Sequence, residues 1–366
     1  MAYTQLLSPI RIGGITVPNR IVMPPLVIWK AGLDGLVNEA HLQHYTQSAG
    51  PGLCIVEAAA VSPEGRLAAT QLGVWSEDHV EGLGRLAAII HQAGAVAGIQ
   101  IHHAGGRTNP QKNGGLPILV PSREAAVEAR AVELTAAEIE RIIADFGRAA
   151  ERCIAAGFDL IEIHGAHGFL PSQFLSPEKN RRNDQWGGSI NNRVRFLVEC
   201  VRAVQQASRK AARTVLVTAR LGVADGGSPP LTVEDGCAAA ALLAASGVDL
   251  LDISHAGSLP SDDPPRRWSQ TLELARETRK HVTVPVIGVG EIKTPAEAEA
   301  ALADGVADMI AVGRALLADP EWAAKSVAGK AERIYRCIDC KPRCFHHSEP
   351  EKCPPRRTAA AANSPE

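Results

Sequence analysis

Eight short apolar segments recur along the chain, separated by patterns typical of amphipathic helices, as in 137–156, 194–206 and 233–245. Such alternation predicts parallel strands joined by helices that return over the outside of the sheet. Eight units predict an α/β fold of the (β/α)8, or TIM, barrel type, preceded by a small hairpin over 8–19. The expected strands are 20–23, 53–57, 96–102, 160–163, 215–220, 250–254, 285–289 and 309–312.

Two histidines follow the fourth predicted strand, within the stretch 161–170 that reads Ile-Glu-Ile-His-Gly-Ala-His-Gly-Phe-Leu. In barrels of this type, catalytic residues lie at the C-terminal ends of the strands. If the chain turns helically after the strand, His164 and His167 are three residues apart and face the same way. Both imidazoles could then donate hydrogen bonds to one oxygen above the barrel. The alternative is a pair of buried histidines that serve only the core.

Polar residues also end or directly follow three other predicted strands: Gln100, Arg220 and His255. Each has an alternative without a catalytic role. Gln100 could be an ordinary polar residue at a strand end, Arg220 could pair with a surface carboxylate, and His255 could be structural or only line a pocket. The last two strands lead to Gly290 and to Gly313-Arg314. Barrels often bind phosphate there, through backbone N–H groups and a cation. No Gly-x-Gly-x-x-Gly fingerprint of a dinucleotide site is present, so the pattern favours a mononucleotide.

Taken in order, these motifs resemble the old yellow enzyme family of flavin-dependent oxidoreductases. The resemblance includes Phe-Leu-Ser-Pro at 174–177, Asn-Arg-Arg at 180–182, Gly-Gly-Ser at 187–189 and Asn-Arg-Ile-Val-Met at 19–23. It implies FMN, with NAD(P)H and a small molecule such as an α,β-unsaturated carbonyl as substrates. His164 and His167 would bind the carbonyl oxygen, and the substrate would be bordered by Trp29, Phe169 and His255. The residues implied at the flavin are Pro24, Pro25, Leu26, Val27, Ala58, Gln100, Arg220, Gly290, Gly313 and Arg314.

Two residues depart from the pattern of that family. Val27 stands where the family keeps a hydroxyl or thiol that touches the flavin, and valine has no such hydrogen bond to donate. Phe169 stands where the family usually has a tyrosine that gives a proton to the substrate. The proton could come from water or from His255, or the enzyme could oxidise a substrate such as an amine and need no donor. The long segment 104–135 is expected to be a lid or binding loop.

Four of the eight cysteines crowd the C-terminal part of the chain: Cys337, Cys340, Cys344 and Cys353. Their spacing can hold iron–sulfur or zinc, and four free thiols are the alternative. The segment resembles the cluster-binding part of the dienoyl-CoA reductase and trimethylamine dehydrogenase branch. That resemblance implies [4Fe–4S], which could serve an external electron-transfer partner, while the spare ligands His346 and His347 keep zinc open. The expected domains are a barrel over 1–330, a Cys-rich metal segment over 331–353 and a disordered tail over 354–366.

The net charge of −2 argues against nucleic acid or an anionic membrane surface as a partner. The sequence has no run of the roughly 20 apolar residues that span a bilayer and no recognisable secretory signal, so a cytoplasmic protein is expected. The sequence does not decide whether the chain forms a homo-oligomer. Two other functions fit the residues. One is a non-catalytic subunit that binds flavin or a partner through the cysteine tail. The other is a metal-dependent barrel hydrolase that uses His102, His103, His164, His167 and His255.

Overall fold

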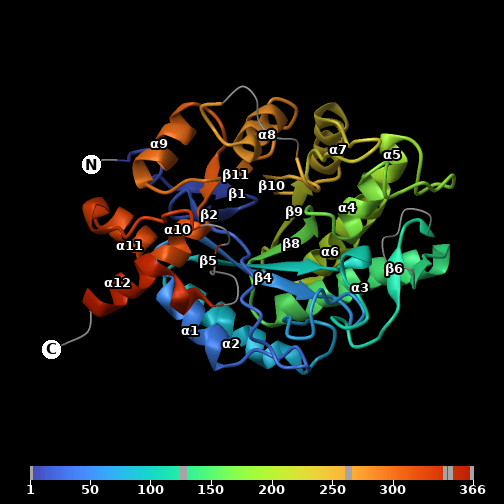
Figure 1. The fold of residues 1–366 in the computed structure, drawn as a ribbon, viewed down its shortest axis with the longest axis horizontal. Coiled ribbons are helices and arrows are strands. Elements are labelled where there is room, and N and C mark those ends of the chain that lie inside the picture. Colours follow the sequence, from blue (N-terminus) through green and yellow to red (C-terminus); the bar gives the residue numbers. More distant parts are fainter. Residues whose placement is uncertain (1–2, 124–129, 260–265, 341–343, 345–348, 363–366) are drawn as a thin grey trace.

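The computed structural model describes residues 3–123, 130–259, 266–340, 344 and 349–362. Within these residues, eight parallel strands close into a barrel that helices surround (Figure 1). The predicted (β/α)8 barrel is confirmed, and every predicted strand overlaps an observed one. In order around the barrel, the strands are β3 (Ile21–Met23), β4 (Leu53–Ala60), β5 (Val96–His102), β8 (Leu160–Gly165), β9 (Leu216–Gly222), β10 (Leu250–Ser254), β11 (Val286–Val289) and β12 (Met309–Ala311).

The predicted N-terminal hairpin, β1 (Ile10–Ile12) and β2 (Ile15–Val17), is observed and closes the N-terminal end of the barrel. Its inner residues pack in one buried cluster with residues at the starts of the barrel strands: Leu53, Leu160, Leu216, Leu250 and Met309. Successive residues of a strand face opposite sides of the sheet. Leu160 therefore shares its inward face with Glu162 and His164. The interior thus changes from apolar at the hairpin end to polar at the C-terminal end.

The helices cover the outer faces of the strands because each has one apolar side. α3 (Ala136–Ala155) buries Ile139, Ile142 and Phe146, and it begins at a capping box between Thr135 and Glu138. The other helices of the described chain are α1 (Glu39–Gln47), α2 (His79–Gln92), α4 (Leu170–Leu175), α5 (Ile190–Arg193), α6 (Arg195–Lys210), α7 (Val233–Ala245), α8 (Gln270–Arg279), α9 (Pro295–Ala303), α10 (Arg314–Ala318), α11 (Trp322–Val327) and α12 (Pro354–Ala362). No helix in this part of the chain has both the length and the apolar character needed to cross a membrane.

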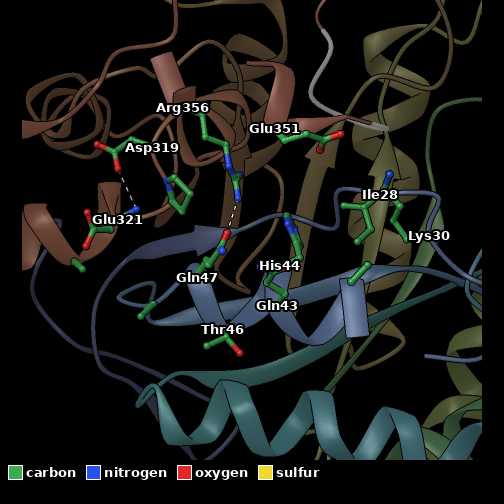
Figure 2. Close-up of a pocket in the computed structure, with 14 residues that line it drawn as sticks. Ile28, Lys30, Gln43, His44, Thr46, Gln47, Asp319, Glu321, Glu351 and Arg356 are labelled. Atoms are coloured by element: carbon green, nitrogen blue, oxygen red, sulfur yellow. Dashed lines mark hydrogen bonds between the residues drawn. The ribbon is translucent and has the colours of Figure 1, made fainter. Parts of the chain in front are cut away.

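The C-terminal part corrects one prediction. The disorder predicted over 354–366 is wrong for 354–362, which forms α12. Arg356 of α12 donates a hydrogen bond to Gln47 Oε1 of α1 at 2.6 Å, across a cavity of about 650 Å³ (Figure 2). The described residues that line this cavity include none of the predicted site residues. Residues 363–366, together with His346 and His347, lie outside the described residues.

The long segment 104–135 also contains regular structure. A 3-10 turn at Gly105–Arg107 is followed by β6 (Ile118–Val120) and β7 (Ala131–Glu133), which pair in parallel, and 124–129 lie outside the described residues. Arg182, from the polar loop after α4, donates hydrogen bonds to the carbonyl oxygens of Pro121 and Leu134 at 2.9 and 2.7 Å. These bonds fasten the small sheet to the loop that follows the two site histidines.

Candidate active site

The two histidines meet, although not through the predicted helical turn. His164 lies in β8, and His167 follows in the connection to α4 with φ of +55°, so the chain there is left-handed. The backbone N–H of His167 is held by the carbonyl oxygen of His255 at 3.0 Å. His164 Nε2 lies 3.3 Å from His167 Nδ1, and the two ring centroids are 5.1 Å apart.

Hydrogen bonds indicate which nitrogen of each imidazole carries the proton. His164 Nδ1 accepts the N–H of Ala166 at 3.3 Å, so the neutral ring carries its proton on Nε2. His167 Nδ1 then accepts from His164, and His167 Nε2 donates to Ser254 Oγ at 2.8 Å. Burial lowers the pKa of both histidines well below 6.5, and the nearby guanidinium of Arg220 adds to the effect. The pair therefore stays neutral, and each ring keeps one N–H, on Nε2, which donates to His167 Nδ1 in one case and to Ser254 Oγ in the other.

Aromatic rings and one cation border the pair. The Phe169 ring lies 4.7 Å from the His164 ring, and the His255 ring lies 4.9 Å from the His167 ring. The guanidinium of Arg107, which the sequence prediction missed, lies 5.9 Å from the centre of the Phe169 ring. The structure thus brings Phe169 and His255 to the histidines. Trp29 is half-buried in the loop after β3, with φ of +56°, and has no ring contact with them among the described residues.

A buried polar layer lies inside the barrel beside and below His164. The strand register places Arg220 next to His164 on one side and next to Asp252 on the other. Arg220 Nε lies 3.3 Å from Asp252 Oδ2, and Gln100 donates a hydrogen bond to Glu162 at 2.8 Å. Burial raises the pKa of Glu162 to about 8 and that of Asp252 to about 6.

The predictions missed both of these buried acids. The signal was present, because each acid stands between apolar residues in a predicted strand, at 161–163 and 251–253. In a barrel whose outer face packs on helices, the alternate positions of such a strand face the interior. Charged residues at those inward-facing positions could therefore have been added to the predicted site.

The loops after β11 and β12 line a cavity of about 350 Å³ at the predicted phosphate site. Gly290 has φ of +151°, and a Cβ atom there would collide with the hydroxyl oxygens of Ser269 and Thr271. Arg314 is joined there by Lys293, a second cation that the predictions missed. The carboxylate of Asp339 contacts both cations, with Arg314 Nη1 at 3.1 Å from Oδ1. The same cavity is lined by Pro24, Leu26, Arg220 and Gly313, so it continues toward the polar layer.

The remaining predicted flavin residues follow β3 or lie in β4. Pro24 and Pro25 are buried, while Leu26 and Val27 are partly exposed. Ala58 is buried in an irregular part of β4, where the pairing with β5 shifts between Val56 and Ala59. A methyl group at this position is small enough to leave room beside the strand end.

The structure does not show a metal site at the C-terminal cysteines or at the histidines of the hydrolase alternative. Among the described residues, no three His, Cys, Asp or Glu side chains are gathered closely enough to hold a metal ion. The histidines that a metal-dependent hydrolase would use contact protein groups instead. For example, His102 Nε2 lies 2.7 Å from Gln71 Nε2. All four C-terminal cysteines are free, with Cys353 buried and the others partly exposed.

Comparison with known proteins identifies the family. Residues 5–332 match the model of the NADH:flavin oxidoreductase / NADH oxidase family. The chain is 40% identical over 355 residues to an NADH oxidase of Thermoanaerobacter brockii, covering 94% of this chain and 54% of that protein. It is 38% identical over 322 residues to an NADPH dehydrogenase of Geobacillus sp. (strain WCH70), covering 87% of this chain and 92% of the relative.

Two solved structures share the fold at 27% identity. A 2-naphthoyl-CoA reductase in complex with 2-naphthoyl-CoA has a TM-score of 0.85, covering 94% of this chain and 55% of its own. An old yellow enzyme homologue from Zymomonas mobilis has a TM-score of 0.77, and the match covers 92% of this chain and 95% of the homologue. The chain thus spans about half the length of two of these four proteins and nearly all of the other two. The predicted resemblance is confirmed: the chain belongs to the NADH:flavin oxidoreductase / NADH oxidase family, the flavin oxidoreductases of old yellow enzyme type.

Proposed function

We propose that this chain is an FMN-dependent NAD(P)H oxidoreductase that reduces an alkene conjugated with a carbonyl group. The observation that carries the proposal is the neutral pair of buried His164 and half-buried His167 at the mouth of the barrel, next to the inward-facing Arg220. A cavity with two cations lies at the same barrel end, where FMN would place its phosphate. FMN bound there would supply the chemistry of hydride transfer between NAD(P)H and the alkene.

The residues present fit a flavin ring. Several buried polar atoms at this barrel end have no hydrogen-bond partner in the described structure: Glu162 Oε2, both Asp252 carboxylate oxygens, Arg220 Nε and His255 Nδ1. Buried polar groups are normally satisfied, so a ring that carries donors and acceptors on its edge suits this site. Arg220 would supply positive charge beside that ring and stabilise its electron-rich reduced form.

The histidine pair would bind the carbonyl oxygen of the substrate. His164 has its proton on Nε2, and a carbonyl oxygen is a better acceptor for it than the 3.3 Å contact to His167. Donors held in place where negative charge develops lower the barrier to hydride transfer. The proton for the other alkene carbon would come from water or from His255, because Phe169 has none to give.

Cofactor identity tests the proposal first. Heat release of the flavin, followed by chromatography, should recover FMN and no FAD. NAD(P)H should then bleach the flavin absorbance of the anaerobic protein, and an enone should restore it. Recovery of FAD, or no flavin after reconstitution with FMN, would refute the cofactor assignment.

One observation favours a second candidate. Phe169 leaves the histidine pair without a neighbouring phenol, and oxidation of a substrate such as an amine needs no proton donor at that position. In that case an amine, and not NAD(P)H, would bleach the flavin. The same spectroscopic titration therefore separates the two functions.

The C-terminal cysteines would form a second redox-active or structural site. Their spacing supports a [4Fe–4S] cluster more than zinc. Such a cluster would pass electrons to an external partner or only brace the C-terminal part. Iron and sulfide analysis after anaerobic purification, with zinc measured in parallel, tests this proposal. Iron below about a tenth of the protein concentration after reconstitution would refute the cluster.

A further inference from the structure

One carboxylate lies where the proposed phosphate would have to bind. Asp339 contacts Lys293 Nζ through one oxygen and Arg314 Nη1 through the other, the latter at 3.1 Å. Lys293 follows β11 and Arg314 follows β12, so this single side chain joins the two loops that form the cavity. Glu291 also approaches Arg314, at 3.6 Å, but it has no contact with Lys293 among the described ion pairs.

Asp339 comes from the cysteine segment and not from the barrel. It lies between Cys337 and Cys340, and its φ of +48° is left-handed. Cys337 Sγ lies 3.8 Å from Asp339 Oδ1, and both residues line the 350 Å³ cavity. The segment that carries the cysteines is therefore attached to the barrel through the cations of the cavity.

We infer that Asp339 is an internal anion that competes with the phosphate of FMN for Lys293 and Arg314. The inference rests on the proposed FMN site. Both anions need the same N–H donors, and a phosphate dianion next to a carboxylate is repelled by it. Binding of the phosphate therefore displaces Asp339, and with it the Cys337–Cys340 part of the chain.

The exposure of these groups makes such a displacement feasible. The side chains of Lys293, Arg314 and Asp339 are 36–40% exposed. Ion pairs this open to water stabilise a protein only slightly. A phosphate has a larger charge and more acceptor oxygens than a carboxylate, so it replaces Asp339 on the two cations. Asp339 sets the affinity for phosphate-bearing flavins and leaves the ring end of the site unaffected.

Competition of this kind has a reciprocal consequence. If Asp339 occupies the cations about nine-tenths of the time, the apparent Kd for FMN is weakened about tenfold. By linkage, FMN must in turn weaken the attachment of the cysteine segment, and it does so more strongly as its concentration rises above its Kd. Riboflavin has the same ring without a phosphate. Asp339 should therefore not weaken the binding of riboflavin, and riboflavin should not loosen the cysteine segment.

Flavin fluorescence titrations of the flavin-free full-length chain test the inference. Asp339→Asn should bind FMN on the order of tenfold more tightly than the unaltered chain, with riboflavin affinity unchanged. Glu291→Gln is the matched control, because it removes a carboxylate that touches only Arg314, and it should change FMN affinity much less. Equal FMN affinity in the unaltered chain and Asp339→Asn, or an equal gain for riboflavin, would overturn the inference.

Thiol labelling gives the second readout. With metal removed by a chelator, FMN should speed alkylation of Cys337 in the unaltered chain, followed by peptide mass spectrometry. Riboflavin should not, and Asp339→Asn should label fast without either flavin. Labelling of Cys337 that ignores FMN would contradict displacement of the segment. If the unaltered chain and both variants bind no FMN, the proposed function itself falls, and the competition with it.

Discussion

The histidine pair and the phosphate cavity lie at the same end of one barrel, yet different kinds of structure hold them. His164 and Arg220 belong to neighbouring strands, are buried and keep their positions through the strand register. Lys293, Arg314 and Asp339 belong to loops or the start of a short helix, are partly exposed and hold one another through ion pairs. The first arrangement favours fixed geometry for chemistry, and the second allows an anion to be exchanged.

The electrostatics of the two regions differ in the same way. At the histidine end, burial keeps the imidazoles neutral and lowers their pKa. At the phosphate end, hydrogen bonding to Lys293 lowers the pKa of the Asp339 carboxyl, which therefore stays charged. Changes at the histidines should therefore alter the chemical step, while changes at the charged end should alter cofactor affinity.

The largest expected effect is at the histidine end. Replacing both His164 and His167 by Ala should raise the activation free energy of alkene reduction by about 3–6 kcal/mol, because two hydrogen-bond donors to the developing charge are lost. The rate of alkene reduction should fall roughly 10²–10⁴-fold. Flavin reduction by NAD(P)H should be affected much less. Stopped-flow measurement of the two half-reactions checks this, with His91→Ala as a control, since His91 pairs with Asp159 before β8. Equal losses in both half-reactions would contradict the assigned role.

A gain is expected when a proton donor is restored beside the pair. Phe169→Tyr should speed alkene reduction by about tenfold or more, since general acid catalysis typically contributes 10²–10⁴-fold. Flavin reduction should stay nearly unchanged. His255→Ala should slow alkene reduction only if His255 gives the proton. If neither variant changes alkene reduction across several enones, the assigned proton step is wrong, and oxidation of a substrate such as an amine becomes the favoured function.

A smaller effect is expected between the two regions, where Val27 would touch the flavin. Val27→Thr should raise the reduction potential by about 20 mV, because one added hydrogen bond of roughly 1 kcal/mol favours the reduced ring. Val27→Ala adds no donor and serves as the control in the same spectroelectrochemical titration. An unchanged or lower potential in the Thr variant would place Val27 away from the flavin.

The smallest expected effect is an absence of pH dependence. A histidine with an ordinary pKa of 6.5 would be only about one-quarter neutral at pH 6. Because the pKa values of His164 and His167 lie well below 6.5, both rings stay neutral as the pH falls from 8 to 6. The histidine pair should therefore add no change to the Kd of a saturated ketone analogue over this range, and any change that is seen belongs to Glu162 and Asp252, whose pKa values lie near 8 and 6. A clear inflection near pH 6.5 in its binding curve would mean that the pair titrates normally.

The strand-end residues were the most predictable part of the site. Apolar periodicity located all eight barrel strands, and the barrel then placed Gln100, His164 and Arg220 on its interior. His167 shows the limit, since its left-handed turn depends on a bond to the His255 carbonyl that no local pattern reveals. Glu162 and Asp252 could have been found by extending the same alternation along their strands.

The loop residues were less predictable because tertiary contacts position them. Lys293 and Asp339 are 46 positions apart, and nothing in either local sequence indicates that they meet. The α12 helix had a local signal that was passed over, because its run of alanines favours a helix. Its packing against α1 through Arg356 and Gln47 is again a long-range contact.

The most direct test of the proposed reaction is an anaerobic absorbance titration of the purified full-length chain between 300 and 500 nm. We predict a flavin spectrum that NAD(P)H bleaches and that an α,β-unsaturated carbonyl restores. A chain that shows no flavin band after reconstitution with FMN would contradict the proposed cofactor. A band that NAD(P)H bleaches but no enone restores would contradict alkene reduction.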